Sequence, residues 1–357
     1  MTRASSGDAW LPFGSITDVE GITVGHFQRT GRGWQTGTTA VICERGATPG
    51  VDVRGGGPGT RETDAIDPQN LVQEIHGICL TGGSAFGLAA SHGLMDWLEA
   101  RGLGFPVGTS SGSPQVVPVV PGAVIFDLAR GGDGRNRPNA EFGMRAAKNA
   151  RSSQLRWGSV GAGTGARAGG LQGGVGTAST VVSVDGLEIT VGALAVANPN
   201  GSVIDLSTAL PWERCGLTMQ RPPAGERAAL AAATAVPAGP DSLNTDNLNT
   251  DNLNTTIGVV ATTARLDKAE TSKFASVAHD GMARAIRPAH SMTDGDTVFG
   301  LATGMHHLPT EARHRALNAL LAAGADTFAA ACTHAVLAAT TVGAAQAYRE
   351  VCPSALR

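Results

Sequence analysis

Two neighbouring residues, Asn254 and Thr255, stand where a polar segment becomes an apolar one. Before them the chain repeats Leu-Asn-Thr-Asp-Asn from Leu243 onward, and after them residues 256–262 are mostly β-branched and apolar. This composition predicts a buried strand. A threonine hydroxyl becomes a nucleophile when an adjacent base takes its proton. If the bond before Thr255 is cut, the new α-amine, whose pKa is about 8, supplies that base.

The junction itself has two interpretations. In the first, the hydroxyl of Thr255 attacks the carbonyl of Asn254 and the resulting ester hydrolyses. The chain then becomes an N-terminal nucleophile hydrolase made of two pieces, 1–254 and 255–357. In the second, the repeat is a surface loop and Thr255 only opens a strand. Both interpretations make residues 237–254 a flexible linker, and these residues alone do not decide between them.

Three polar residues elsewhere could assist such a nucleophile. Asp294 and Asp296 are two residues apart before an apolar run, so an extended backbone would place both on the same side. They either cap a solvated turn, or they position the catalytic amine and hydroxyl and raise the basicity of the amine. Asn198 ends a predicted strand, where it is either a turn former or an amide donor to an oxyanion.

The composition excludes several other classes of function. A net charge of −3 over 357 residues, without a Lys/Arg run, offers no basic surface for nucleic acid. No run of about 18 apolar residues and no signal-peptide core is present, so we expect no membrane partner and a cytoplasmic location. The five cysteines show no CxxC spacing, which argues against a disulfide framework and a zinc cage.

No motif predicts a metal or a cofactor. His306, His307 and His314 lack the spacing of ligands on one helix face and have no acidic partner. The string Gly-x-Gly-x-x-Ala at 161–166 lacks both a long preceding strand and a following helix, so it does not predict a dinucleotide site.

Hydrophobic periodicity predicts alternating strands and helices. Asp185-Gly186 between apolar runs predicts a hairpin of strands 177–184 and 187–197. The other predicted strands are 22–24, 38–43, 50–53, 75–80, 123–126 and 256–262. The predicted helices are 88–101, 140–150, 223–236, 268–286, 310–323 and 325–347. The last helix is apolar nearly all round, so we expect it to be buried, within the chain or between subunits.

Six separated motifs occur in an order that resembles a known family. They are RGGGPGTRETD at 54–64, LTGGSAFGL at 80–88, GAGTGA at 161–166, NP at 198–199, NTTI at 254–257 and DGDT at 294–297. The chain resembles the group of L-aminopeptidase/D-amidase-esterases, β-peptidyl aminopeptidases and 6-aminohexanoate-oligomer (nylon-oligomer) hydrolases. The similarity extends from about Ile16 to Gly304 and into the last helices.

The resemblance implies an α/β fold, an α/β/β/α sandwich of the N-terminal nucleophile hydrolase type, in a single catalytic domain over 1–357. It implies self-cleavage between Asn254 and Thr255, and the Asn-Thr junction resembles the nylon-oligomer hydrolases more than the Ser-headed aminopeptidases. The substrate would be a small peptide-like or ω-amino-acid amide with a free amine. The family also implies a homo-oligomer, typically a tetramer of cleaved heterodimers, without a cofactor.

Site residues follow from the same resemblance. The oxyanion Asn of the family corresponds to Asn198, and its acidic pair corresponds to Asp294 and Asp296. Gly163 and Thr164 of the glycine segment are expected to bind substrate, as is Arg137.

The chain departs from the family at two positions near the substrate. Relatives commonly carry a Lys where this chain has Gly170, with only Gln172 nearby, and often a Tyr where it has Arg137. These departures leave the substrate open. Two other functions therefore remain as alternatives: an acyltransferase of the ornithine acetyltransferase type, and an uncleaved, inactive scaffold.

Overall fold

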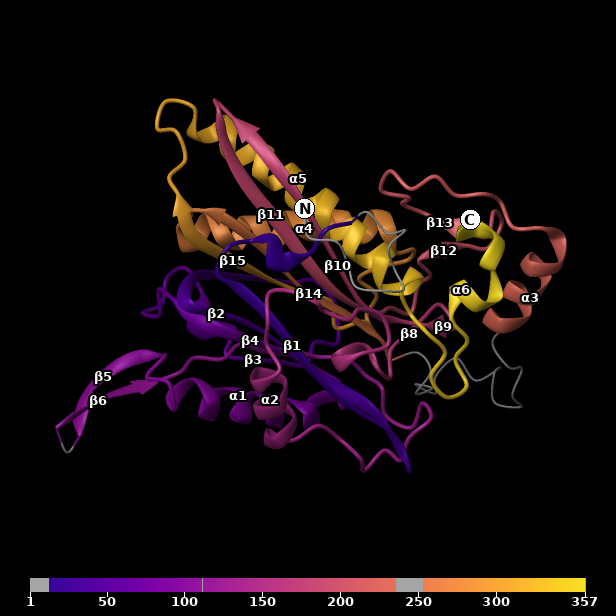
Figure 1. Ribbon diagram of the computed structural model, residues 1–357, viewed down its shortest axis with the longest axis horizontal. Helices are drawn as coiled ribbons and strands as arrows, with labels where there is room; N and C mark the ends of the chain where they lie inside the picture. The colour runs from indigo at the N-terminus through magenta and orange to yellow at the C-terminus, as the bar shows by residue number, and fades with distance from the viewer. Residues whose placement is uncertain (1–12, 111, 236–252, 357) are drawn as a thin grey trace.

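A computed structural model describes residues 13–110, 112–235 and 253–356 (Figure 1). Two sheets lie face to face, and a pair of helices covers the outer face of each. The helices of one outer layer are α4 (Lys268–Ala285) and α5 (Arg313–Leu337), and those of the other are α1 (Ala90–Glu99) and α2 (Ala140–Lys148). This arrangement confirms the predicted α/β/β/α sandwich.

The first sheet has the strand order β10-β11-β14-β15-β2, in which only β14 and β15 are parallel. The second contains β1, β2, β4, β7 and β3. The bounds are β1 Ile22–Gly31, β2 Trp34–Val53, β3 Thr60–Arg61, β4 Ile75–Thr81, β7 Gly122–Val124, β10 Gly174–Val184, β11 Leu187–Asn198, β14 Thr255–Ala264 and β15 Thr297–His306.

Strand β2 belongs to both sheets. Its residues 38–42 pair with β4, and after an irregularity its residues 48–53 pair with β15. The sequence predicted two short strands here, 38–43 and 50–53. The structure corrects this to one strand of 20 residues, bent at the irregularity so that a single chain segment crosses from one layer to the other.

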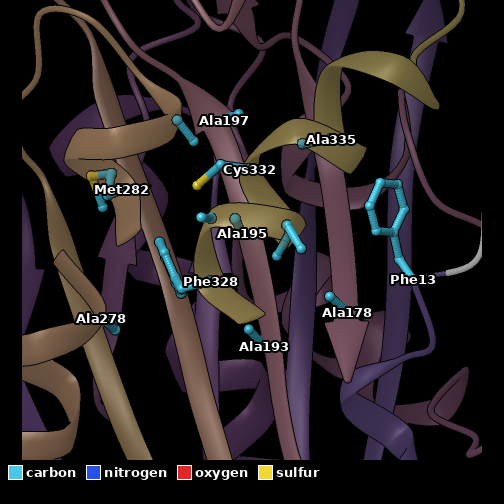
Figure 2. Close-up of a cluster of buried hydrophobic side chains, with 14 of the residues drawn as sticks. Phe13, Ala178, Ala193, Ala195, Ala197, Ala278, Met282, Phe328, Cys332 and Ala335 are labelled. Atoms are coloured by element: carbon cyan, nitrogen blue, oxygen red, sulfur yellow. The ribbon is translucent and has the colours of Figure 1, made fainter. Parts of the chain in front are cut away.

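Three hydrophobic cores fill the spaces between the layers. Along β14, Ile257, Val259 and Ala261 face the core between the sheets, whereas Val260 faces the core under α4 and α5. This alternation is the period of two expected of a strand buried on both faces. Figure 2 shows the core under α5, where Cys332 lies near Ala195 of β11. The ring of Phe328 packs against Gly258 of β14.

The predicted hairpin is confirmed. Asp185 and Gly186 have φ values of 50° and 82°, so both turn residues occupy the left-handed region that a tight hairpin requires.

The prediction of two helices over 310–323 and 325–347 was wrong. One helix, α5, runs through Gly324 and ends at Leu337. A Cβ at Gly324 would lie 2.5 Å from the ring of Phe274, so this glycine allows close helix packing and does not end the helix. Although α5 is long and apolar enough to span a membrane, 78% of its most apolar stretch is buried inside the protein, as in a core helix.

The remaining elements are short. They are α3 (Ala224–Thr234), α6 (Tyr348–Val351), β5 (Phe105–Ser110), β6 (Ser113–Val117), β8 (Arg167–Ala168), β9 (Leu171–Gln172), β12 (Ile204–Asp205) and β13 (Leu210–Pro211), with 3-10 turns at Ile16–Asp18, Asp64–Ile66, Ser84–Ala89, Gly161–Gly163 and Pro353–Leu356. Of the predicted linker 237–254, residues 237–252 lie outside the described part of the chain.

Candidate active site

The Asn254–Thr255 junction lies at the head of a central strand. Thr255 is the first residue of β14 and stands opposite Asn198 of β11 in the antiparallel register. Asn254 pairs with Asp294 in an isolated parallel bridge. The fold therefore brings three segments that are distant in sequence to one point, and both junction residues are only 5% exposed.

The hydroxyl of Thr255 lies against the carbonyl that it would attack. Thr255 Oγ1 donates a hydrogen bond to the carbonyl oxygen of Asn254. The backbone N–H of Gly295 donates to the same oxygen at 3.2 Å. A donor at this oxygen favours negative charge there, which is what develops when a carbonyl is attacked. This backbone N–H is a site group that the sequence analysis did not identify.

Gly295 also lies close to the hydroxyl of Thr255. A Cβ at this position would lie 2.9 Å from Thr255 Oγ1 and 2.8 Å from the carbonyl oxygen of Gly57. The space beside the hydroxyl therefore requires a residue without a side chain. A glycine between two aspartates is the sequence signal that could have revealed this close approach.

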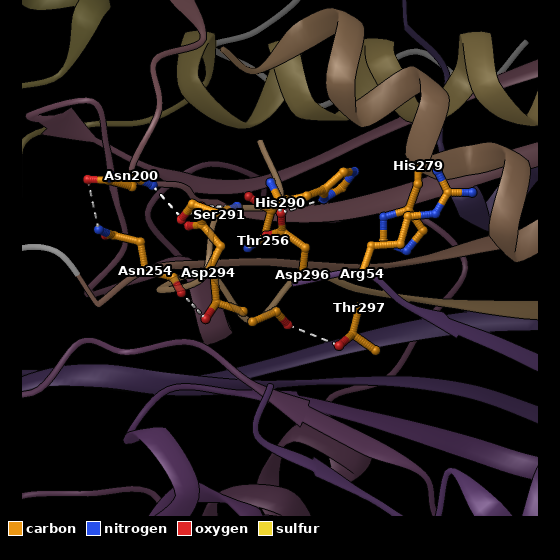
Figure 3. Close-up of polar contacts among 12 residues, drawn as sticks. Arg54, Asn200, Asn254, Thr256, His279, His290, Ser291, Asp294, Asp296 and Thr297 are labelled. Atoms are coloured by element: carbon orange, nitrogen blue, oxygen red, sulfur yellow. Dashed lines mark hydrogen bonds and ion pairs between the residues drawn. The ribbon is translucent and has the colours of Figure 1, made fainter. Parts of the chain in front are cut away.

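Asp296 fixes Thr256, the residue that follows Thr255. One carboxylate oxygen accepts the N–H of Thr256 at 2.7 Å. The other accepts the N–H of His290 at 3.0 Å and its ring Nδ1 at 2.8 Å (Figure 3). These contacts hold the start of β14. The geometry therefore supports a positioning role for Asp296.

Asp294 organises the loop on the other side of the junction. Its carboxylate accepts from Ser291 Oγ at 2.6 Å, from the N–H of Ser291 at 3.2 Å and from the N–H of Asn200 at 3.3 Å. The pKa of Asp294 is raised, chiefly by burial. The negative charge of Asp296 also raises it, whereas the hydrogen bond from Ser291 lowers it. Only 1% of each aspartate is exposed, and the charge of one acts on the other.

The glycine loop at 54–59 supports this acidic segment from behind. The N–H of Gly57 donates to the carbonyl of Asp294 at 2.8 Å, and that of Arg54 donates to the carbonyl of Asp296 at 3.0 Å. A Cβ at Gly55 would lie 2.3 Å from the nitrogen of Asp296. The loop therefore serves as a close-packed structural turn.

Asn198 is fully buried, and its amide has a fixed orientation. Its Oδ1 accepts from Arg130 Nη1 at 2.8 Å and from the N–H of Arg167 at 2.9 Å. Because two donors meet this atom, the other end of the amide is the NH₂ group, which donates to the carbonyl of Phe126 at 3.3 Å. The NH₂ group thus contacts Phe126, and the oxyanion role of Asn198 stays a prediction.

Arg130 is a site residue that the sequence analysis missed. It is only 4% exposed, and its Nη2 donates to the carbonyl of Leu253 at 2.7 Å and to Asn254 Oδ1 at 2.9 Å. The sequence places Arg130 at the start of a polar loop. Nothing in its spacing indicated that this arginine turns inward to the junction.

Two histidines, the partly exposed His290 and the buried His279, extend the contacts of Asp296. The ring of His290 packs edge to face on His279, with 4.9 Å between the ring centres. His279 Nε2 lies 3.0 Å from the carbonyl of Asp52, so this nitrogen carries the proton. Burial lowers the pKa of His279 to about 4, which keeps its ring neutral at pH 7.

Of the residues predicted to bind substrate, Gly163 and Thr164 are buried and Arg137 lies on an exposed ring. Gly163 packs on the start of β10, and Thr164, fully buried, donates its hydroxyl to the carbonyl of Gly161 at 2.8 Å. Arg137 stacks on the ring of Phe86, which is 59% exposed. The role of all three in substrate binding stays a prediction.

The two positions that depart from the family also have defined neighbours. Gly170, with φ of 88°, lies against Thr234 of α3. Gln172 is buried and donates to the carbonyl of Ala166 at 2.9 Å. The buried cation that contacts the junction in this chain is the guanidinium of Arg130.

The described residues were also compared with two other kinds of site, a metal site and a large cavity. They contain no cluster of three or more His, Cys, Asp or Glu that could hold a metal ion. A cavity of about 510 Å³ opens between β10 and α5, but none of the residues that form the junction lines it.

Comparisons with known proteins agree with the geometry. Residues 14–349 match the model of peptidase family S58. An uncharacterized aminopeptidase of Mycobacterium tuberculosis (strain ATCC 25618 / H37Rv) is 46% identical, over 96% of this chain and 98% of its own length. A 6-aminohexanoate-oligomer endohydrolase of Paenarthrobacter ureafaciens is 28% identical, over 86% of this chain and 78% of its own.

Among solved structures, the L-aminopeptidase D-Ala-esterase/amidase of Ochrobactrum anthropi, described as a variant of the Ntn hydrolase fold, superposes with a TM-score of 0.67. It is 20% identical, and the match covers 92% of this chain and 87% of that one. A β-aminopeptidase of Burkholderia sp. gives a TM-score of 0.66 at 22% identity, with the same coverage. At these identities the likeness concerns the fold. The chain therefore belongs to peptidase family S58, a family of peptide-bond hydrolases, and has the Ntn hydrolase fold.

Proposed function

We propose that this protein is a self-processing aminopeptidase or amidase whose nucleophile is Thr255. The observation that carries the proposal is the contact between the Thr255 hydroxyl and the carbonyl of Asn254, with the N–H of Gly295 on the same oxygen. A nucleophile, its target and a donor to the developing oxyanion thus meet at one buried bond.

Processing would take place in two steps. Thr255 Oγ attacks the carbonyl carbon of Asn254 and forms an ester, while the bond to the nitrogen of Thr255 breaks and that nitrogen becomes an amine. Water then hydrolyses the ester, which leaves a carboxylate on Asn254 and a free hydroxyl on Thr255. The mature enzyme consists of residues 1–254 and 255–357, which remain together as one catalytic domain.

Turnover of substrate would repeat the same chemistry. The α-amine of Thr255 takes the hydroxyl proton as Oγ attacks the substrate amide, and it returns the proton to the leaving amine. Water hydrolyses the acyl-enzyme. Asn198 would donate to the oxyanion, while Asp294 and Asp296 hold the acidic loop and the first residues of β14.

The proposed substrate is a small peptide-like or ω-amino-acid amide with a free amine. The names of the aminopeptidase and oligomer-hydrolase relatives support this class. We also propose that the cleaved heterodimers assemble into a homo-oligomer in the cytoplasm. Native mass spectrometry of the purified protein tests the assembly.

Mass spectrometry of the intact protein tests the processing. We expect a fragment that begins at Thr255, together with amidase turnover. Thr255→Ala should stay uncut and lose at least about 10³-fold in turnover, because no hydroxyl remains. Thr255→Ser, the matched control, keeps a hydroxyl and should be processed. An uncut, inactive wild-type chain would instead support the scaffold alternative, and faster acyl transfer to an amine than to water would support the acyltransferase.

A further inference from the structure

Arg130 links the two sides of the Asn254–Thr255 bond. Asn198, whose Oδ1 accepts from Arg130 Nη1 at 2.8 Å, lies directly opposite Thr255 in the register of β11 and β14. On the other side of the bond, Arg130 Nη2 donates to Asn254 Oδ1 at 2.9 Å and to the carbonyl of Leu253 at 2.7 Å. One guanidinium therefore contacts the residue opposite Thr255 and both residues that precede Thr255.

The position of Arg130 is fixed by the body of the protein. The residue is only 4% exposed, and its guanidinium lies over the ring of Phe126 at 5.5 Å from the centroid. Its carbonyl accepts from Arg167 Nη2 at 3.1 Å, and the N–H of Arg167 donates to Asn198 Oδ1 at 2.9 Å. Because a guanidinium carries its donors in a rigid fork, a fixed Arg130 can hold several acceptors at set positions.

The backbone on the amino-terminal side of the bond is held less tightly. In the described part of the chain, strand pairing at Asn254 is limited to an isolated bridge with Asp294. Its N–H donates to the carbonyl of Thr293, and its carbonyl accepts from the N–H of Gly295, each at 3.2 Å. The contacts from Arg130, at 2.7 and 2.9 Å, are shorter than these and carry a charge, which strengthens a hydrogen bond.

We propose that Arg130 is a positioning residue for the self-cleavage, which tethers the carbonyl of Asn254 at the hydroxyl of Thr255 before the bond is cut. Arg130 makes and breaks no bond itself. It acts through the side chain of Asn254 and the carbonyl of Leu253, and a small misplacement of reacting atoms slows a reaction greatly. This inference rests on the proposed function of Thr255, and it gives the side chain of Asn254 a role in processing.

The first test follows the rate at which the fragment that begins at Thr255 appears after cell-free synthesis, measured by mass spectrometry. Arg130→Met, which has no donor, should slow this rate about 10- to 100-fold. Arg130→Lys should fall between Arg130→Met and the wild type, because an ammonium keeps the charge but lacks the fork. Arg145→Met, which removes an exposed cation of α2, should process like the wild type.

Two outcomes of this test would overturn the inference in different ways. If Arg130→Met processes at the wild-type rate, Arg130 does not tether the bond, and the proposed function of Thr255 still stands. If the wild-type chain stays uncut, the proposed function fails together with the inference.

A double-mutant cycle separates tethering from a general loss of structure. Asn254→Ala removes the Oδ1 that Arg130 binds. If the guanidinium acts through this oxygen, Arg130→Met should slow processing at least about 3-fold less in Asn254→Ala than in the wild type. Some effect should remain, since the contact with Leu253 is unchanged. Fully additive effects would contradict the proposal.

The other end of the contact decides the question if urea unfolding shows that Arg130→Met does not fold. Asn254→Ala should then slow processing at least about 10-fold. Asn200→Ala removes the more distant partner of the same side chain, at 3.5 Å from Asn254 Nδ2, and should slow processing less (Figure 3). Wild-type processing of Asn254→Ala, or a larger effect of Asn200→Ala, would contradict the proposal.

Discussion

The chain is held differently on the two sides of the Asn254–Thr255 bond. On the carboxyl-terminal side, every residue of β14 is buried, and β11 and β15 pair with its two edges. On the amino-terminal side, Asn254 forms one isolated backbone bridge with Asp294, and its side chain contacts Arg130 and Asn200. Backbone hydrogen bonds to β11 and β15 therefore hold Thr255 and the residues after it, whereas side-chain contacts hold Asn254.

The proposed self-cleavage would require a difference of this kind. The nucleophile must keep its position after the cut, and a ladder of backbone hydrogen bonds does not depend on what precedes Thr255. The acyl side must leave so that a substrate can enter, and a few side-chain contacts can be exchanged for contacts to the substrate. Three changes test whether the two sides differ in this way.

The largest effect should come from acid acting on the carboxyl-terminal side. His279 packs on His290, which donates to Asp296. Burial lowers the pKa of His279 to about 4, against about 6.5 in an unfolded chain. Between these values the folded protein binds fewer protons than the unfolded one, so stability falls as the pH falls, by up to about 3 kcal/mol.

His279→Gln should remove this part of the pH dependence. Urea unfolding of the wild type and the variant at about pH 7 and about pH 4.5 measures the change. Comparison with His92→Gln, which replaces an exposed histidine of α1, controls for the substitution itself. If His279→Gln and the wild type lose the same stability between the two pH values, His279 does not support this side.

The second change acts on the contact to Thr256. In Asp296→Asn, one oxygen becomes an NH₂ group that faces the N–H of Thr256 or the donors of His290. Unpaired buried donors cost about 1–3 kcal/mol, so we expect processing to slow about 10- to 100-fold. The rate at which the Thr255 fragment appears, followed by mass spectrometry, is the measurement. Asn200→Ala, on the opposite side, should slow processing less, and the reverse order would break the comparison.

The smallest effect should come from adding one methyl group beside the hydroxyl of Thr255. In Gly295→Ala the new Cβ would lie 2.9 Å from Thr255 Oγ1, which displaces the hydroxyl from the carbonyl of Asn254. We expect processing to slow about 10-fold, because a small misplacement of reacting atoms is costly. Gly225→Ala in α3 has no neighbour within 4 Å of its Cβ and should process normally. Unchanged processing of Gly295→Ala would show that this close approach is unimportant.

Much of the fold could be predicted because the signals are local. The apolar run after Thr255 predicted β14, and Asp185-Gly186 predicted the hairpin that places Asn198 at a strand end. The predictions that failed, the ends of α5 and β2, depended on contacts with residues distant in sequence. The continuity of α5 through Gly324 is set by the ring of Phe274, and the continuity of β2 is set by pairing with two different strands.

In the candidate site, too, some residues were predicted and those that depend on distant contacts were not. Thr255, Asn198 and the two aspartates meet where motif order and the resemblance placed them. Arg130 and His290 were missed because loop geometry, which no periodicity encodes, brings Arg130 to Asn254 and His290 to Asp296. The N–H of Gly295 was missed for a related reason, since a backbone donor leaves no side-chain pattern in the sequence.

The strand order has a further consequence for the mature protein. Residues 255–357 supply β14 and β15, and these two strands lie between β11 and β2 of the preceding piece. Cutting the connection would therefore produce two polypeptides that are interleaved through the middle of one sheet. Neither could dissociate without exposing the cores on both faces of that sheet, and reassembly from separated fragments would become a second-order reaction.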